Sequence, residues 1–173
     1  TNISHAHLAS FDNIEGITKE KAMICSGLVK SGLLLFPIDA PYSKHIFGMI
    51  KKKEVRWLTF GCTRTSDIYM HKIMFNNNRT LINIDIQHVK NLRVDLNALG
   101  SHHAVNSLTV LGTVLELALN LNKAIHYLKR WQPLVGRGKI LDLKLKRGSK
   151  DLFIKVIDES YNCNPSSLNA SLE

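Results

Sequence analysis

The sequence is 173 residues long, enough for one ordinary domain, and its 45% of hydrophobic residues can bury a core. A membrane-spanning helix needs an apolar run of about eighteen residues, and none occurs, so we expect no membrane span. The formal net charge of +9 could indicate nucleic-acid binding. The lysines and arginines are spread along the chain, however, so a solvated basic surface is the better explanation.

The first residues and the cysteines bear on where the protein works. The chain begins TNISHAHL, with neither an initiator methionine nor a signal pattern, so we expect it to start within a longer protein. The cysteines, Cys25, Cys62 and Cys163, are widely spaced and odd in number. They fit neither a disulfide framework nor a paired zinc motif, which predicts a reducing, cytoplasmic location.

The first half of the chain begins with an α/β pattern. Asn13 can cap a helix that extends to about Gly27, with apolar residues at helical spacing and Lys21 on or beside the apolar face. The run LLLF after Gly32 predicts a buried strand of a parallel sheet. Pro41 then favours the start of a helix over residues 42–53. Strand, loop and helix would form half of a βαβ unit.

The rest of the chain predicts further sheets and a helical hairpin. Short segments between Val55 and Leu96, divided by polar turns, predict a small antiparallel sheet. A long helix after Gly100 and a second helix ending near Trp131 would pair as a helical hairpin. Alternating apolar and polar residues over 139–158 predict a β-hairpin. We expect a domain boundary near the end, with residues 1–160 in one domain and 161–173 opening another.

Three short motifs in this second half carry chemistry. GSHHAVN at residues 100–106 places a glycine turn before a helix N-terminus, where unpaired amides favour anions. GRG at 136–138 offers the planar, permanently charged Arg137 between glycines. DESYNCNP at 158–165 puts an acidic residue at a strand end, followed by a polar loop. The first two are weak alone, since a structural loop or a surface arginine explains either.

Taken together and in this order, the motifs resemble those of the Mur ligases, in the branch that adds D-alanyl-D-alanine to the peptidoglycan precursor. The chain departs from that pattern at His103, where the family has Asn, and at Cys163, usually Ala. The resemblance implies an α/β fold: the later part of a Mur-ligase central ATPase domain, a mostly parallel sheet with helices plus a small antiparallel sheet. The start of a Rossmann-like C-terminal domain would follow.

The resemblance also implies binding roles for the motif residues. Contacts to ATP fall to His102, Asn106, Arg137 and Asp158. Arg137 would act catalytically, meeting the γ-phosphate as charge develops in transfer. The incoming dipeptide would bind between the central and C-terminal domains, where orienting hydrogen bonds would come from Tyr161, Asn162 and Asn164. The family often has Asn in place of Pro37 for adenine recognition, whereas Asp39 aligns.

Two further matches concern Mg²⁺. NISHAHL resembles the family's N-I-x-x-A-H-L, which implies that His7 is a ligand or neighbour of a magnesium ion. A zinc site formed by His5 and His7 is the alternative, but it lacks a third protein ligand at recognisable spacing. Lys21 falls where the family has a catalytic lysine whose amine is carbamylated, which gives a carboxylate suited to Mg²⁺. An ordinary lysine whose stem covers an apolar helix face is the alternative for Lys21.

The activity implied by the resemblance is ATP-dependent joining of D-alanyl-D-alanine to UDP-N-acetylmuramoyl-tripeptide through an acyl phosphate. The protein would act as a cytoplasmic monomer that binds no nucleic acid. The sequence contains no G-x-x-x-x-G-K-S/T phosphate loop, and the resemblance does not extend to the family's N-terminal domain, so we expect this chain alone to be inactive. Two other hypotheses remain: a non-catalytic remnant of a split or degraded ligase gene, and a nucleic-acid-binding module.

Overall fold

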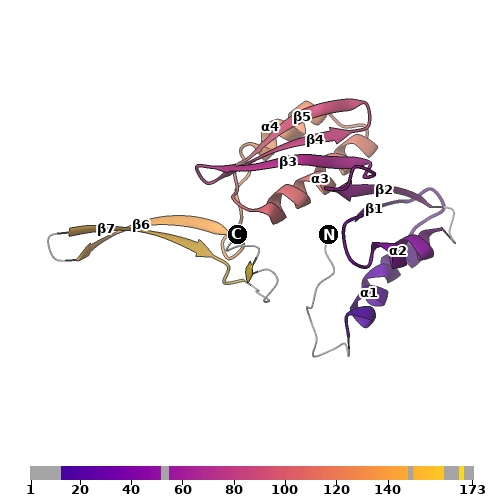
Figure 1. Ribbon diagram of the computed structural model, residues 1–173, viewed down its shortest axis with the longest axis horizontal. Coiled ribbons are helices and arrows are strands. Elements are labelled where there is room, and N and C mark those ends of the chain that lie inside the picture. Colours follow the sequence, from indigo (N-terminus) through magenta and orange to yellow (C-terminus); the bar gives the residue numbers. More distant parts are fainter. Residues whose placement is uncertain (1–12, 52–54, 148–149, 162–167, 170–173) are drawn as a thin grey trace.

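The computed structural model describes residues 13–51, 55–147, 150–161 and 168–169. Its main body is a five-stranded sheet in the order β1-β2-β3-β4-β5 (Figure 1). The strands are β1 (Leu33–Pro37), β2 (Arg56–Gly61), β3 (Ile68–Asn76), β4 (Arg79–Ile86) and β5 (Val89–Leu96). β1 pairs in parallel with β2, and β2 with β3, whereas β3, β4 and β5 pair antiparallel.

The predicted α/β class, with a helix-covered sheet and a small antiparallel sheet, is confirmed. One detail differs from expectation. The strands between residues 55 and 96 do not form a sheet of their own, because β2 continues the sheet begun by β1 and β3 follows it. Parallel pairing between strands separated by a helix leaves no local mark in the sequence.

The larger core lies between β3–β5 and two helices, α3 (Ser101–Glu116) and α4 (Leu121–Leu128) (Figure 1). Alternation along β4 turns Ile82, Ile84 and Ile86 to this side, where each is at most 1% exposed. They pack in one cluster with residues of α3 such as Leu108 and Leu111, both fully buried. This packing fixes α3 across the sheet.

Arg79 at the start of β4 ties the sheet to the end of α4. Its guanidinium donates to Asp95 Oδ1 at 2.8 Å, to Asn97 Oδ1 at 2.9 Å and to the Lys129 carbonyl at 3.0 Å. The first two partners belong to β5 and the segment after it. The chain that follows α4 therefore leaves from a fixed point on the sheet.

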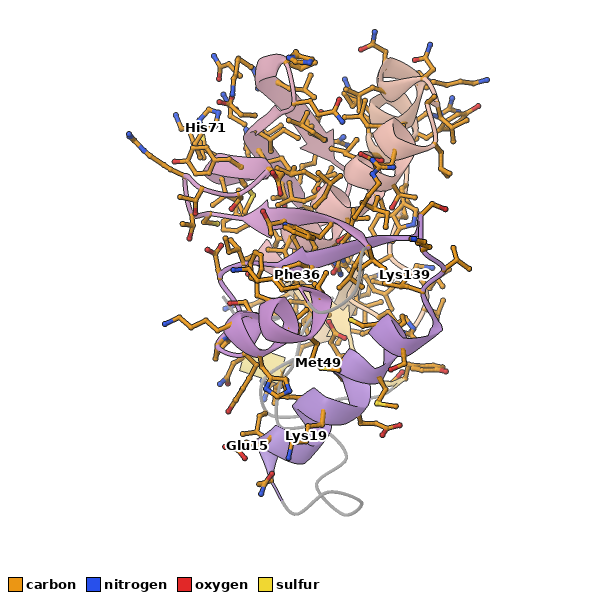
Figure 2. The ribbon with its side chains drawn as sticks, turned by 90° about the vertical axis from the view of Figure 1, so that its right-hand side faces the viewer. Glu15, Lys19, Phe36, Met49, His71 and Lys139 are labelled. Carbon is orange, nitrogen blue, oxygen red and sulfur yellow. The ribbon has the colours of Figure 1, made fainter. Side chains whose placement is uncertain are left out.

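A second, smaller core lies at the β1 end of the sheet. α1 (Ile14–Ala22), capped by the Asn13 side chain as predicted, continues into the 3-10 helix η1 (Met23–Gly27), and α2 (Ser43–Ile50) packs beside them. Phe36 of β1 meets the Phe47 ring edge-on at 5.0 Å. Figure 2 shows α1 extending away from the sheet, with Glu15 and Lys19 at its far end. No described helix is long and apolar enough to cross a membrane.

The predicted β-hairpin of β6 (Lys139–Arg147) and β7 (Lys150–Asp158) is confirmed and projects from the body of the molecule (Figure 1). Within the described residues, no other helix or strand packs extensively on it. The middle of one face is aliphatic, because the register sets Leu141, Leu143 and Leu145 opposite Val156, Ile154 and Leu152. The four leucines are each 38–47% exposed.

Thr80 gives a direct test of how β4 holds the turn before α3. Its buried hydroxyl donates to the Ala98 carbonyl at 2.7 Å and accepts from the Gly100 amide at 3.1 Å. Thr80→Val keeps the shape but leaves both groups without a partner, so we expect a loss of about 1–3 kcal/mol in unfolding free energy, measured with urea. Thr80→Ser, the control, should keep the Gly100 amide signal in an NMR spectrum; a shift of that signal in the Ser variant would contradict this account.

Candidate functional site

The N-terminus of α3 is built on a tight glycine turn. Gly100 has φ of 132°, and a Cβ added there would lie 2.7 Å from the His102 imidazole, so a larger residue would displace the ring. The N-cap residue is Gly100 itself, which has no side chain to cap the first turn of the helix. The amides of that turn therefore keep hydrogen-bonding capacity for a ligand, on the positive end of the helix dipole.

Two histidines fill this first turn. The His102 and His103 rings lie 3.9 Å apart between centroids, and the Trp131 ring meets His103 edge-on at 5.5 Å. His103 is only 9% exposed. Its burial and, secondarily, the neighbouring His102 lower the pKa of His103 from 6.5 to about 4. His103 is therefore neutral near pH 7, and its Nε2 has no hydrogen-bond partner within the described part of the chain.

A cavity of about 620 Å³ opens beside His103, between β5, α3 and α4. Its wall is mostly apolar, with Tyr127 and Trp131 from α4 and the turn after it, and polar groups come from Asn106, Arg130 and His103. Flat aromatic walls with a few hydrogen-bonding groups suit a planar, polar-edged ligand such as a nucleobase.

The GRG loop closes this region from the hairpin side. Gly136 and Gly138 have φ of 78° and 86°, which favour glycine. A Cβ on Gly138 would lie 3.3 Å from His103 Nε2 and 3.2 Å from Glu159 Oε1. The loop backbone thus rests against the α3 N-terminus on one side and the end of β7 on the other.

Asp158 holds the loop through its carboxylate. Its Oδ2 accepts from the Gly136 amide at 2.8 Å, and its Oδ1 accepts from the Ser160 hydroxyl at 2.7 Å and amide at 3.2 Å. The Ser160 hydroxyl, followed by the two amides, lowers the pKa of Asp158 below its usual value. Arg137, between the glycines, lies over the Tyr161 ring with its guanidinium carbon 4.0 Å from the ring centroid.

The structure brings together most of the described residues that the sequence had singled out. His102 stacks beside His103, Asn106 lines the same cavity as His103, and His103 meets the GRG loop that carries Arg137. Asp158 and Tyr161 contact that loop directly. These residues form one cluster at the α3 N-terminus. His7, Asn162 and Asn164 lie outside the described residues.

Lys21 is not part of this cluster. It lies on α1 and lines a separate cavity of about 340 Å³ beside the carboxyl end of β1. The side chain is exposed, although helical spacing in the sequence had placed it on or beside the apolar face of its helix. Among the described residues, no group of three or more His, Cys, Asp or Glu could hold a metal ion.

Asp39 links the carboxyl ends of β1 and β2. Its carboxylate accepts hydrogen bonds from the Cys62 amide and the Thr63 hydroxyl. Gly61 stands immediately before them with φ of 155°, and a Cβ there would overlap the same carboxylate. This use of Asp39 could not be inferred from PIDAP alone, because its partners lie more than twenty residues away.

Sequence reasoning missed the aromatic wall of the cavity. Tyr127 lies in the last turn of α4 and Trp131 in the turn that follows the helix, and both line the cavity. Arg130 lies between them in sequence and lines the same cavity. The signal was the spacing of two aromatic residues and a cation just before the GRG loop.

These features describe an α/β domain in which a helix N-terminus, a base-sized cavity and an arginine loop meet. Residues 1–114 match the model of the Mur ligase middle domain, so the chain belongs to the Mur ligase family. Among curated relatives, it is 26% identical over 175 residues to the UDP-N-acetylmuramoyl-tripeptide–D-alanyl-D-alanine ligase of Buchnera aphidicola, and 27% identical over 173 residues to the UDP-N-acetylmuramate–L-alanine ligase of Dictyoglomus turgidum. These alignments take in 99% and 100% of the chain but 35% of either relative, so the chain spans about a third of their length.

Solved structures show the same fold. MurF from Acinetobacter baumannii superposes with a TM-score of 0.81 at 22% identity, over 98% of this chain and 34% of that one. The MurF ligase from Thermotoga maritima in complex with ADP gives a TM-score of 0.78 at 19% identity, over 99% of this chain and 36% of that one. Relatives of both ligase types match at comparable identity, so these matches do not assign the chain to one branch of the family.

The buried His103 predicts a pH dependence of stability. With a folded pKa of about 4 and an ordinary unfolded value near 6.5, the unfolded chain binds the proton first as pH falls. Stability is therefore fully present above pH 6.5 and is lost as pH falls from about 6.5 toward 4, by roughly 2–3 kcal/mol for this residue. Urea unfolding at several pH values should show a shallower loss for His103→Gln than for the unchanged protein. Parallel curves for the two proteins would rule out the assignment.

Proposed function

We propose that this chain is the nucleotide- and phosphate-contacting part of a cytoplasmic, ATP-dependent ligase that builds the peptidoglycan precursor. The observation that carries the proposal is the meeting of three features at one place: the uncapped α3 N-terminus, the aromatic cavity and the Arg137 loop. Membership of the Mur ligase family supports it independently.

The cavity fits a nucleotide base. In this proposal the base lies against Tyr127 and Trp131, and Asn106 supplies both a donor and an acceptor to its polar edge. The neutral His103 ring contributes to the wall of the same cavity. His102 and the amides of the first turn of α3 stand nearest the phosphates. Asp158 contributes to the nucleotide site from the other side of the GRG loop.

Arg137 is proposed as the catalytic contact to the transferred phosphate. The substrate carboxylate oxygen attacks the γ-phosphorus, ADP leaves, and an acyl phosphate forms. The amine of the incoming substrate then attacks the acyl carbon, an amide bond forms, and phosphate leaves. Charge on the transferred phosphoryl oxygens grows during the first step, and a planar guanidinium can pair with two of them at once.

Mg²⁺ is proposed to neutralise the phosphates, as it does in ATP-dependent transfer. Among the described residues, the family pattern assigns only Lys21 to it, and an unmodified lysine amine is a cation and no metal ligand. A carbamate on that amine would supply the carboxylate oxygens that Mg²⁺ prefers. Exposure of Lys21 beside an open cavity allows carbon dioxide to reach it. His7 stays a predicted second contact.

The substrates are proposed from the DESYNCNP loop. The sequence of this loop favours UDP-N-acetylmuramoyl-tripeptide and D-alanyl-D-alanine as the substrates. The dipeptide is proposed to bind near Tyr161, Asn162 and Asn164. These residues lie at the proposed hinge between a domain of residues 1–160 and a domain that begins at residue 161. The protein is proposed to act as a monomer. Because no G-x-x-x-x-G-K-S/T sequence occurs, the chain by itself is expected not to turn over ATP.

The proposal is tested by measuring phosphate release by the protein that the whole reading frame containing this chain encodes. We expect ATP-dependent release with UDP-N-acetylmuramoyl-tripeptide that requires D-alanyl-D-alanine. Arg137→Ala should lower the rate by about a thousandfold, the scale of an arginine that stabilises phosphoryl transfer. Arg147→Ala, at the tip of the hairpin, is the matched control and should leave the rate unchanged.

Other outcomes of the same assay are equally informative. Release that requires L-alanine and UDP-N-acetylmuramate would assign the protein to a different branch of the family. A folded protein that binds ATP but releases no phosphate with either pair would favour the non-catalytic remnant.

The carbamate on Lys21 can be tested on this chain. In the presence of ¹³C-bicarbonate, we expect an NMR signal from a carbamate carbon on Lys21, because Lys21, unlike Lys19, is in the lining of the cavity of about 340 Å³ beside β1. Lys21→Arg should abolish the signal, whereas Lys19→Arg, two residues earlier on the same helix, should keep it. A signal that persists in Lys21→Arg would assign the modification elsewhere.

A further inference from the structure

The GRG loop is fixed on both sides of Arg137 by Asp158, the last residue of β7, and by Tyr161 after it. The Gly136 amide donates to Asp158 Oδ2 at 2.8 Å, and the Gly138 amide donates to the Asp158 carbonyl at 2.8 Å. The Tyr161 amide donates to the Gly136 carbonyl at 3.1 Å. Arg137 therefore projects from a backbone that the end of the hairpin holds at three points.

The approach of the two segments is close enough to require glycine. A Cβ on Gly136 would lie 2.9 Å from both the backbone nitrogen and the Cβ of Tyr161. Because φ at Gly136 is 78°, a side chain there would also strain the backbone. The loop and the segment 158–161 thus form one unit rather than two neighbouring loops.

The Arg137 side chain is held as well as its backbone. Its guanidinium lies 4.0 Å above the Tyr161 ring, whose other surfaces are open to solvent, since the residue is 68% exposed. A free arginine samples many rotamers, and stacking on an aromatic face removes part of that freedom before a ligand arrives. The guanidinium edges stay available to an anion, because stacking uses only the flat face.

We infer that Asp158 and Tyr161 are positioning residues for Arg137: the carboxylate fixes the loop through Gly136, and the ring fixes the guanidinium. The inference rests on the proposed function, in which Arg137 meets the transferred phosphate. It gives Asp158 a role exerted through the loop backbone, and it gives Tyr161 a role on the phosphate side of the reaction besides any contact with the dipeptide.

The direction of the change in anion affinity distinguishes this positioning role from a direct electrostatic effect of the Asp158 carboxylate. A carboxylate beside an anion site repels the anion, so its removal alone would tighten binding of a polyphosphate. If the carboxylate instead holds Arg137 in place, its removal weakens binding. The two ideas therefore predict opposite signs for Asp158→Ala. Asp158→Asn removes the charge but keeps an oxygen that can accept from Gly136, so the positioning role predicts that it retains most of the affinity.

The experiment is an NMR titration of the ¹⁵N-labelled chain with inorganic tripolyphosphate, together with amide exchange of Gly136 and the Nε–H signal of Arg137 without ligand. We expect about tenfold weaker binding for Asp158→Ala and Tyr161→Leu, the scale of a lost charge-assisted hydrogen bond. Asp158→Asn and Tyr161→Phe should stay within about threefold of the unchanged chain, as neither removes the held geometry. Faster Gly136 exchange in Asp158→Ala and a shifted Arg137 signal in Tyr161→Leu should accompany the losses. Circular dichroism checks that each variant is folded.

Each outcome decides one point. Equal or tighter binding by Asp158→Ala, or an Arg137 signal that is the same in Tyr161→Leu, overturns the positioning role. If Arg137→Ala binds tripolyphosphate as well as the unchanged chain does, the proposed phosphate contact fails. In that case the exchange and Nε–H measurements still decide whether Asp158 and Tyr161 hold the arginine.

Discussion

The packing of Ile82, Ile84 and Ile86 against α3 is the contact on which the candidate site depends. These side chains are buried because inward-facing and outward-facing residues alternate strictly along β4. Their packing against α3 fixes the position at which this helix crosses the sheet. The N-terminus of α3 then fixes His103, and His103 fixes the wall against which the GRG loop rests. A shift of β4 by one residue would turn the isoleucines outward and remove the support of every group in the cluster.

Local patterns in the sequence were enough to predict most of the elements. The alternation of β4, β6 and β7, the cap at Asn13 and the glycine before α3 each act within a few residues, so their consequences are visible in the chain itself. The joining of β1 to β2 was not visible, because a parallel pair is set by the packing of the intervening helix. The exposure of Lys21 in the last turn of α1 was missed because helical spacing does not show which residues of a helix the neighbouring elements cover.

The candidate site was also predictable only in part from the sequence. The motifs containing His102, Arg137 and Asp158 could be found one by one, but their meeting depends on contacts between residues far apart in the sequence, such as Gly138 with His103 and Gly136 with Asp158. The low pKa of His103 follows from burial beneath Trp131, which no spacing reveals. The part of the cavity wall that α4 contributes could likewise not be predicted from the sequence, because it depends on where α4 packs against the sheet. The roles of His7, Asn162 and Asn164 stay predictions.

The hairpin has a consequence for the behaviour of the chain in solution. A two-stranded ribbon with one face aliphatic in its middle and two open edges is the kind of surface that self-associates. Its opposite face carries Lys144, Lys146 and Lys155, of which Lys144 pairs with Asp151 at 2.7 Å, and the whole chain has a charge of +9. Like charge keeps copies apart only over a Debye length, which is about 10 Å at 0.1 M salt. Higher ionic strength therefore screens the repulsion that keeps these hairpins apart. The lysines whose charge could indicate nucleic-acid binding are thus the same residues that oppose aggregation of the chain.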